Sequence, residues 1–258
     1  MTQSPQDQTD EPDDESSQKT RRERKPRSFW RELPILILVA LVLSFLLQTF
    51  VARVYLIPSE SMEPTLHGCA GCTGDRIVVE KISYRFGDPK PGDIVVFRGP
   101  DSWNDEFVSQ RSNNSVIRGA QEVGSLIGVV APDENDLVKR VIATGGQTVE
   151  CCDAEGRVLV DGKPLDEPYI QMDFPFDPVT MSCDTELKSG RCFDPVTVPE
   201  GNIWVMGDNR SNSRDSRYHV TDEYSGTVPV DNVIGKAVFI ALPPSRTGIL
   251  HSPDIQGR

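Results

Sequence analysis

One long apolar run near the start of the chain constrains the fold more than any other feature. It extends from Leu33 to about Ala52, with no charged residue between Glu32 and Arg53. At about 1.5 Å of rise per helical residue, roughly 20 residues span the hydrocarbon thickness of a bilayer. The alternatives are a buried soluble helix and a cleaved secretory signal, whose apolar core is usually shorter and is followed promptly by a small-x-small site. The sequence favours an uncleaved transmembrane anchor over residues 32–53.

The residues before the anchor are polar and divided by charge. Acidic side chains gather over residues 7–15, and basic side chains gather over residues 19–31. A stretch with so few apolar residues cannot bury enough surface to fold, so we expect residues 1–31 to be a disordered tail. Basic residues beside a span mark its cytoplasmic side. The pattern therefore predicts a single-pass cell-membrane protein with a cytoplasmic N-terminus and residues 54 onward outside.

The formal net charge of the whole chain is −12. A chain this acidic repels phosphate backbones, so we expect no nucleic acid among its partners. The expected anchor makes the lipid bilayer one partner.

All six cysteines follow the span, in the part expected to be exported. An even set in an exported chain predicts disulfides. Cys183 and Cys192 enclose a short polar loop and are the favoured pair. Cys69 and Cys72 form a CxxC, for which a structural disulfide is favoured over a redox or zinc site because the chain offers no second CxxC or histidine pair. The pairing at residues 151–152 stays open, and no metal or cofactor is expected.

Short runs rich in valine and isoleucine, bounded by Gly, Pro and Asp, dominate the chain after the span. This composition is typical of strands. The runs lie at residues 76–81, 93–98, 136–142, 156–160, 202–206 and 235–241. Asp161-Gly162 adds a hairpin signal. We therefore expect a mostly β fold: an exported β domain over residues 54–245 with a small inserted cysteine-rich β subdomain at about 150–200, behind one N-terminal transmembrane helix.

Two segments fall outside the strand pattern. Residues 100–135 form an insertion in which apolar residues at 116, 120, 123, 127 and 130 fit a helical stripe. They predict a surface helix over residues 115–130, of the kind that rests on a bilayer. The residues after 245 are polar and proline-containing, and they predict a flexible tail over residues 246–258.

A serine in a tight, proline-flanked segment just beyond the span is an unusual place for a hydroxyl. This residue, Ser61, needs a base to become a nucleophile, and the usual bases are histidine or a lysine made neutral by burial. Of the three histidines, two stand in a loop and in the tail, and the third could equally be a solvated loop residue, so a Ser-His site is disfavoured. Lys139 shares one face of a predicted strand with Leu137 and Val141, where it would be desolvated. Spacing alone favours an ordinary edge-strand lysine.

Four motifs stand in series behind the anchor. They are Ile57–Leu66, Gly92–Phe97, Leu137–Ala143 and Gly207–Tyr218. In sequence and order they resemble the motifs of bacterial type I signal peptidases. The resemblance covers roughly residues 34–98, 136–150 and 203–241. It implies that the β domain is a catalytic Ser-Lys peptidase domain, a membrane-bound serine endopeptidase that removes signal peptides from exported precursor proteins, which are then its main partners.

The resemblance also implies roles for single residues. Ser61 matches the acylating nucleophile and Lys139 the neutral general base. Ser59 matches the side chain that joins the Ser61 backbone N–H in an oxyanion hole. Ser213 matches the hydroxyl that orients the lysine ammonium. The remaining matches are a supporting ion pair, Asp215 with Arg217; residues that hold the loop around Ser213, namely Asp208, Asn209 and Arg210; and residues lining shallow pockets for small side chains, namely Ile57, Pro58, Met62 and Leu66.

Three departures limit this transfer. The 100–135 insertion separates Ser61 from Lys139, and Glu60 places a negative charge beside the nucleophile where a small residue is common. Val220 stands where the family often has glycine. The sequence leaves two other classes open: an anchored, disulfide-bonded binding module without catalysis, and a self-cleaving Ser-Lys protease of the repressor type, which the span and the lack of a DNA-binding helical unit disfavour.

Overall fold

The computed structural model describes residues 29–69, 72–103, 112, 114–126 and 136–257. Most of the expected disordered tail, residues 1–28, lies outside these ranges, and residues 29–31 are helical instead. Of the surface helix expected over residues 115–130, residues 115–126 are helical, and residues 127–130 lie outside the described residues.

Helix α1 (Phe29–Phe50) is the apolar element that the sequence predicts. Its segment Glu32–Phe50 has a mean hydropathy of 2.5, long and apolar enough to cross a membrane. The helix ends three residues before the predicted limit of the anchor. Residues 52–56 form strand β1 instead, because their backbone pairs antiparallel with β2, with Ala52 opposite Glu80.

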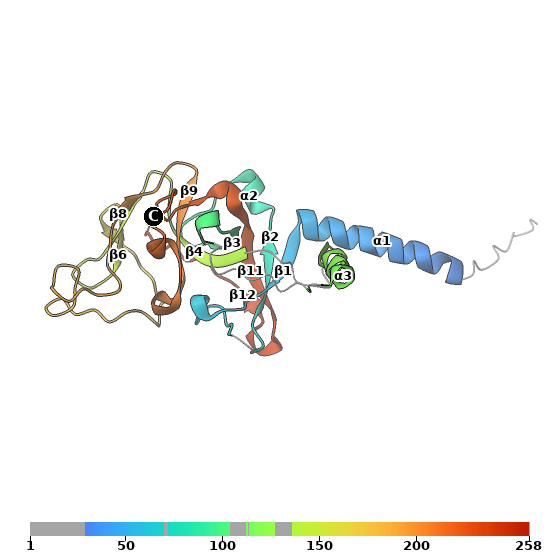
Figure 1. Cartoon of the computed structure of the whole chain (residues 1–258), viewed down its shortest axis with the longest axis horizontal. Coiled ribbons are helices and arrows are strands. Elements are labelled where there is room, and N and C mark those ends of the chain that lie inside the picture. The colour runs from blue at the N-terminus through green and yellow to red at the C-terminus, as the bar shows by residue number, and fades with distance from the viewer. Residues whose placement is uncertain (1–28, 70–71, 104–111, 113, 127–135, 258) are drawn as a thin grey trace, which may run out of the picture. The chain divides into compact units, whose positions relative to one another are not determined.

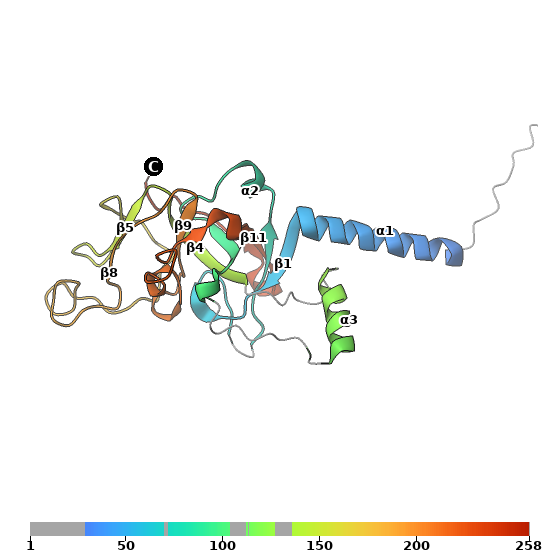
Figure 2. The same ribbon diagram turned by 45° about the horizontal axis from the view of Figure 1, so that its top comes forward.

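The main sheet is antiparallel, with the strand order β1-β2-β11-β3-β4-β9-β10 and with β12 paired to β11. Figure 1 labels most of these strands, and Figure 2 labels the paired strands β4 and β9 next to each other. The strands are β1 (Ala52–Leu56), β2 (Arg76–Glu80), β3 (Ile94–Arg98), β4 (Asp136–Thr144), β9 (Asn202–Met206), β10 (Val228–Pro229), β11 (Val233–Leu242) and β12 (Gly248–Ile249). Strand β4 lies inside this sheet, between β3 and β9.

A second antiparallel sheet has the order β7-β6-β5-β8. Its strands are β5 (Thr148–Cys151), β6 (Val158–Val160), β7 (Lys163–Pro164) and β8 (Phe193–Thr197). It forms the expected cysteine-rich subdomain, and β6 and β8 stand together in Figure 1. The β6–β7 hairpin turns at Asp161 and Gly162, whose φ angles are 51° and 73°. Two consecutive positive φ angles define a type I′ turn, which is the reason for the Asp-Gly signal.

The described residues form three apolar clusters in the core. One contains residues of β1, β2, β3 and β11, and a second contains residues of β3, β4, β9 and β10. The third joins the two sheets, because Val149 of β5 and Val158 of β6 lie in the same cluster as Trp204 of β9. The second sheet is thus packed against the main one. The mostly β fold that the sequence predicts is confirmed, and all six predicted strands are present.

The shorter helices are α2 (Ser83–Phe86) and α3 (Ser115–Leu126), and 3₁₀ turns occur at Glu60–Met62, Asp101–Trp103, Arg210–Asn212, Ser216–Tyr218, Val230–Asn232 and Pro244–Arg246. The side chain of Asn114 caps α3 by accepting hydrogen bonds from the backbone of Val116 and Ile117. Val116 is 79% exposed, as expected for a surface helix. Whether α3 lies on a bilayer stays a prediction.

The segment after residue 245 does not match the flexible tail that its composition predicts. Ile249 belongs to β12, which pairs with β11. Ile255 is 1% exposed within the cluster that joins the sheets, and its carbonyl accepts a hydrogen bond from Asp166 N. Arg246 pairs with buried Asp75. These contacts are long-range, so polar composition gave no sign of them.

Candidate active site

Ser61 lies on the 3₁₀ turn Glu60–Met62 that follows β1. Met62, next in the chain, is 1% exposed in the apolar cluster beneath the turn, which fixes the turn to the core. The backbone on the other side is also held, because Ser61 O accepts a hydrogen bond from Asn209 N at 3.1 Å. Ser61 itself is partly exposed. The serine is therefore presented at the surface on a rigid support.

Lys139 comes from β4 and is 4% exposed. Its Nζ donates a hydrogen bond to Ser61 Oγ at 2.7 Å. In the sheet Lys139 stands opposite Val95, and Leu137 stands opposite Phe97. Both partners are fully buried, so the lysine amine emerges from an apolar surface. Burial disfavours the charged form and lowers the pKa of Lys139 to about 8.

Two further charges act on the lysine in opposite directions. The Asp215 carboxylate raises the pKa of Lys139, and the Arg217 guanidinium lowers it, both by less than burial does. Asp215 is fully buried, accepts a hydrogen bond from Arg217 Nε at 2.8 Å and another from Gly207 N at 2.9 Å. Burial alone would raise the pKa of Asp215, but Arg217, together with the Gly207 N–H and Lys139, holds the pKa below its usual range. The expected ion pair is therefore formed beside the lysine.

Ser59 stands just before the 3₁₀ turn, and its Oγ lies 3.3 Å from Ser61 Oγ. The backbone N–H of Ser61 belongs to the first turn of a helical segment, where N–H groups have no acceptor within the helix. Ser59 Oγ thus lies beside Ser61 Oγ, and its role with the Ser61 N–H in an oxyanion hole stays a prediction. Ser59 is exposed and accessible to a substrate.

The loop after β9 is held by buried contacts. Asp208 accepts two hydrogen bonds from Arg140, at 2.8 Å to Nε and 2.6 Å to Nη2, and both side chains are at most 2% exposed. Asn209 Nδ2 donates to Glu60 O at 3.2 Å, and Arg210 Nε donates to Gly207 O at 3.1 Å. Asp208, Asn209 and Arg210, which are expected to hold this loop, thus each form hydrogen bonds that fix it.

Ser213 departs from the expected arrangement. It is 4% exposed, and among the described residues its Oγ has no hydrogen-bond partner. The predicted contact with the Lys139 ammonium is therefore not formed in this structure. Ser213 Oγ instead lies so close to Gly207 that a Cβ on that glycine would stand 2.2 Å from it. Glycine is required at position 207 for this close approach.

The four residues expected to line a substrate pocket are not alike. Ile57, Met62 and Leu66 are 3% exposed or less and belong to the apolar core. Pro58 is exposed. The pocket role of these residues stays a prediction. Glu60, whose orientation the sequence left open, is exposed, and its carboxylate accepts a hydrogen bond from Asn212 Nδ2 at 3.2 Å.

Sequence reasoning missed three residues around the site. Arg140, to which the sequence analysis assigns no role, forms the buried pair with Asp208. Glu167 pairs with Arg210, and the Arg140 Cζ lies 3.9 Å from the centre of the Tyr169 ring. The partners of these side chains are far away in the chain. Nothing local in the sequence signals them.

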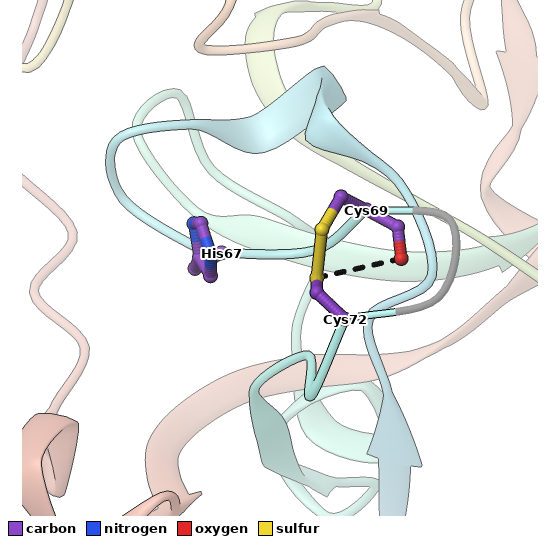
Figure 3. Close-up of side chains that lie close together, drawn as sticks. All are labelled: His67, Cys69 and Cys72. Atoms are coloured by element: carbon purple, nitrogen blue, oxygen red, sulfur yellow. Dashed lines mark hydrogen bonds between the residues drawn. A yellow bond between two sulfur atoms is a disulfide. The ribbon is translucent and has the colours of Figure 1, made fainter.

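The structure joins the cysteines as Cys69–Cys72, Cys183–Cys192 and Cys151–Cys152. The first two are the pairs that the sequence favours, and the third was left open. His67 lies close to the Cys69–Cys72 sulfurs, on the loop that follows Ser61 (Figure 3). With both sulfurs in a disulfide they offer no thiolate to a metal. His67 Nδ1 pairs instead with Glu63 Oε1 at 2.6 Å.

Comparison with known proteins places this site in a family. The family model described as signal peptidase, peptidase S26, matches residues 30–242. The probable signal peptidase I of Mycobacterium leprae is 55% identical over 248 residues, covering 91% of this chain and 83% of the relative. Signal peptidase I of Mycobacterium tuberculosis is 56% identical over 237 residues, covering 89% and 78%.

A more distant relative, the probable signal peptidase I-1 of a Synechocystis strain, is 40% identical over 227 residues, covering 88% of this chain and 90% of the relative. The match with each relative extends over most of both chains, and the family model covers the turn that carries Ser61, β4 and the loop after β9. The chain therefore belongs to the type I signal peptidases of peptidase family S26.

Proposed function

We propose that this protein is a membrane-anchored serine endopeptidase that removes N-terminal signal peptides from exported precursor proteins with a Ser61–Lys139 dyad. The single observation that carries the proposal is the 2.7 Å contact between Lys139 Nζ and Ser61 Oγ. A buried amine with a pKa of about 8 is neutral in a sizeable fraction of molecules near neutral pH. Such an amine is able to accept the serine proton.

In the first step, the neutral Lys139 amine takes the proton from Ser61 Oγ as that oxygen attacks the scissile carbonyl carbon. The negative charge that develops on the carbonyl oxygen is stabilised by Ser61 N–H and Ser59 Oγ. The tetrahedral intermediate then collapses, and the Lys139 ammonium returns its proton to the leaving amine. The mature protein departs, and the signal peptide remains as an ester on Ser61.

In the second step, the neutral Lys139 accepts a proton from a water molecule, which attacks the ester. Asp215 and Arg217 tune the lysine through this cycle, since Asp215 favours its charged form and Arg217 its neutral form. The ester breaks, Ser61 Oγ regains a proton from Lys139, and the free signal peptide leaves. The cycle needs no metal and no cofactor.

The anchor explains the substrate class. Ser61 follows the last residue of α1, Phe50, by 11 residues, which even fully extended reach roughly 36 Å. If α1 spans the bilayer with its N-terminus in the cytoplasm, the nucleophile works close to the outer membrane face. A precursor whose signal helix occupies the same bilayer brings its extended cleavage segment there. Sharing one membrane raises the local concentration of both partners.

The extended cleavage segment would add as a strand beside the site, with small side chains at the first and third positions before the cut. The test is cleavage of a synthetic peptide with an Ala-x-Ala sequence before the scissile bond by the detergent-solubilised full chain. We expect a single cut after the second alanine, abolished by Ser61→Ala. An intact peptide would favour the rival, an anchored binding module without catalysis.

A further inference from the structure

We propose that Glu167 and Tyr169, in the inserted cysteine-rich subdomain, are positioning residues for the Ser61–Lys139 site. Both belong to the segment of residues 167–172, which leaves the second sheet and which we call the strap. This inference rests on the proposed function and extends it, because it assigns a part of the reaction machinery to the subdomain that contains the second sheet. Sequence reasoning transferred no role to this region.

The first contact of the strap is an ion pair. Both Nη atoms of Arg210 donate to the Glu167 carboxylate, and the two side chains are 3% and 8% exposed. The Tyr169 hydroxyl donates to the same carboxylate at 2.8 Å. Removing one partner of such a pair leaves an uncompensated buried charge, whereas removing both is often tolerated. Glu167 is thus the counter-ion on which the buried Arg210 depends.

The second contact is made by the face of the Tyr169 ring. It lies 3.9 Å from the Cζ atom of Arg140, the residue next to Lys139 on β4. The guanidinium of Arg140 also donates two hydrogen bonds to Asp208. A planar cation between an aromatic face and a carboxylate has little freedom to turn. The ring therefore fixes the pair that joins the lysine strand to the loop after β9.

The third contact is made by the backbone of the strap. Met172 forms a parallel bridge with Asn209, and Arg210 N donates to Met172 O at 2.9 Å. Asn209 N in turn donates to Ser61 O, and Arg210 O accepts from Arg217 Nη2 at 2.9 Å. The loop residues held by the strap are thus the ones that touch the nucleophile turn and the Asp215–Arg217 pair.

These contacts determine what a loosened strap changes. Burial is the largest influence on the Lys139 amine, so water that enters beside β4 would make the protonated amine easier to form. A positioning role therefore changes the pH dependence of the rate, which loss of stability alone does not. In the molecules that remain folded, a higher pKa of Lys139 means that the amine is protonated at a higher pH. The acid limb of the rate profile therefore moves to higher pH.

The experiment measures peptide cleavage by the detergent-solubilised full chain over a range of pH, with the concentration of reactive sites determined by active-site titration. Tyr169→Leu removes the ring face without changing charge. We expect kcat to fall at least tenfold per titrated site, KM to stay within about twofold, and the acid limb to move upward by at least half a pH unit. Tyr169→Phe keeps the ring over Arg140, and we expect it to retain the position of the acid limb.

The ion pair is tested by a double-mutant cycle. We expect Glu167→Gln to lower kcat at least tenfold, and the double variant Glu167→Gln/Arg210→Gln to lose less than the product of the two single losses. The matched control is Glu155→Gln in the same subdomain, whose side chain is 68% exposed and pairs with exposed Arg157. We expect it to match the wild type.

Two results would overturn the inference while leaving the dyad intact. One is an unchanged acid limb in Tyr169→Leu together with normal kcat per titrated site. The other is strict multiplicativity in the cycle. Failure of the proposed function would give different results: the wild-type chain would not cleave the peptide, or Lys139→Ala would cleave it as well as the wild type.

Discussion

Lys139 Nζ lies 2.7 Å from Ser61 Oγ, although the two residues are 78 positions apart in the chain. The serine comes from a 3₁₀ turn at the end of β1, and the lysine comes from the interior of the main sheet. Two rigid elements set their separation, so the contact does not depend on a mobile loop. The following predictions test what this geometry implies.

Loss of either partner should stop the reaction. We expect Ser61→Ala and Lys139→Ala to lower kcat/KM for an Ala-x-Ala peptide by at least about 10³-fold, because serine without its base is a weak nucleophile. The control is Lys163→Ala, which removes an exposed lysine of the second sheet and should leave the rate unchanged. Cleavage at the wild-type rate by purified Lys139→Ala would exclude the dyad.

The rate should fall on acidification. The pKa of Lys139 is lowered to about 8, and only the neutral amine accepts a proton. Below that pH the neutral fraction falls about tenfold per pH unit, so log(kcat/KM) should approach a slope of one. The measurement is a pH profile of kcat/KM between about pH 5 and 9. A level profile through mildly acidic pH contradicts a lysine base.

The buried Lys139 amine should lower the stability of the fold at neutral pH. The pKa of Lys139 in the folded chain is about 8, against 10.5 for the unfolded chain, so the unfolded state binds more protons between these values. Folding is therefore penalised below pH 8, by about 3 kcal/mol, and the penalty disappears as pH rises past 10.5. We expect Lys139→Met to be more stable than the wild type at pH 7, by roughly 1–3 kcal/mol.

This prediction is checked by urea unfolding of the detergent-solubilised chain at pH 7 and again near pH 10. The stabilisation by Lys139→Met should shrink at the higher pH, where the wild-type lysine is neutral in the fold. An advantage that is equal at both pH values would show that packing of the methionine is responsible.

The buried Arg140–Asp208 pair should be sensitive to removal of one partner. Asp208→Asn leaves the Arg140 guanidinium, 2% exposed, without its counter-ion. We expect the free energy of unfolding to fall by about 3–5 kcal/mol. Arg157→Ala breaks the pair with Asp153 at the surface, where the arginine is 50% exposed, and should cost at most about 1 kcal/mol. Equal effects in the two variants would contradict the difference in burial.

The C-terminal segment should contribute to stability. Ile255 is 1% exposed between the two sheets, whereas Ile249 is 70% exposed. Ile255→Ala should therefore lower the free energy of unfolding by about 2–5 kcal/mol, and Ile249→Ala should change it by less than about 0.5 kcal/mol. Both are measured by urea unfolding of the full chain. An unchanged free energy of unfolding in Ile255→Ala would instead support the flexible tail predicted for residues 246–258.

Much of the fold follows from patterns within short windows. The apolar run that becomes α1, the valine-rich strands and the Asp-Gly turn between β6 and β7 are all local signals, because they reflect backbone preference and side-chain period. Strands with weak patterns were missed, among them β8, whose Phe193–Thr197 contains a proline, and the two-residue β10 and β12. Their pairing partners, far away in the chain, decide that they are strands.

The sequence alone determined the long apolar helix, the β class, the two favoured disulfides and the identity of Ser61 and Lys139 as candidates. It left Lys139 as an ordinary edge-strand lysine by spacing, because burial depends on which strands lie on either side. Only the tertiary structure places β4 inside the sheet and joins Arg140 to Asp208. It also brings Glu167 and Tyr169 of the strap against Arg210 and Arg140. Desolvation and buried pairing arise from long-range packing, which no short window of sequence contains.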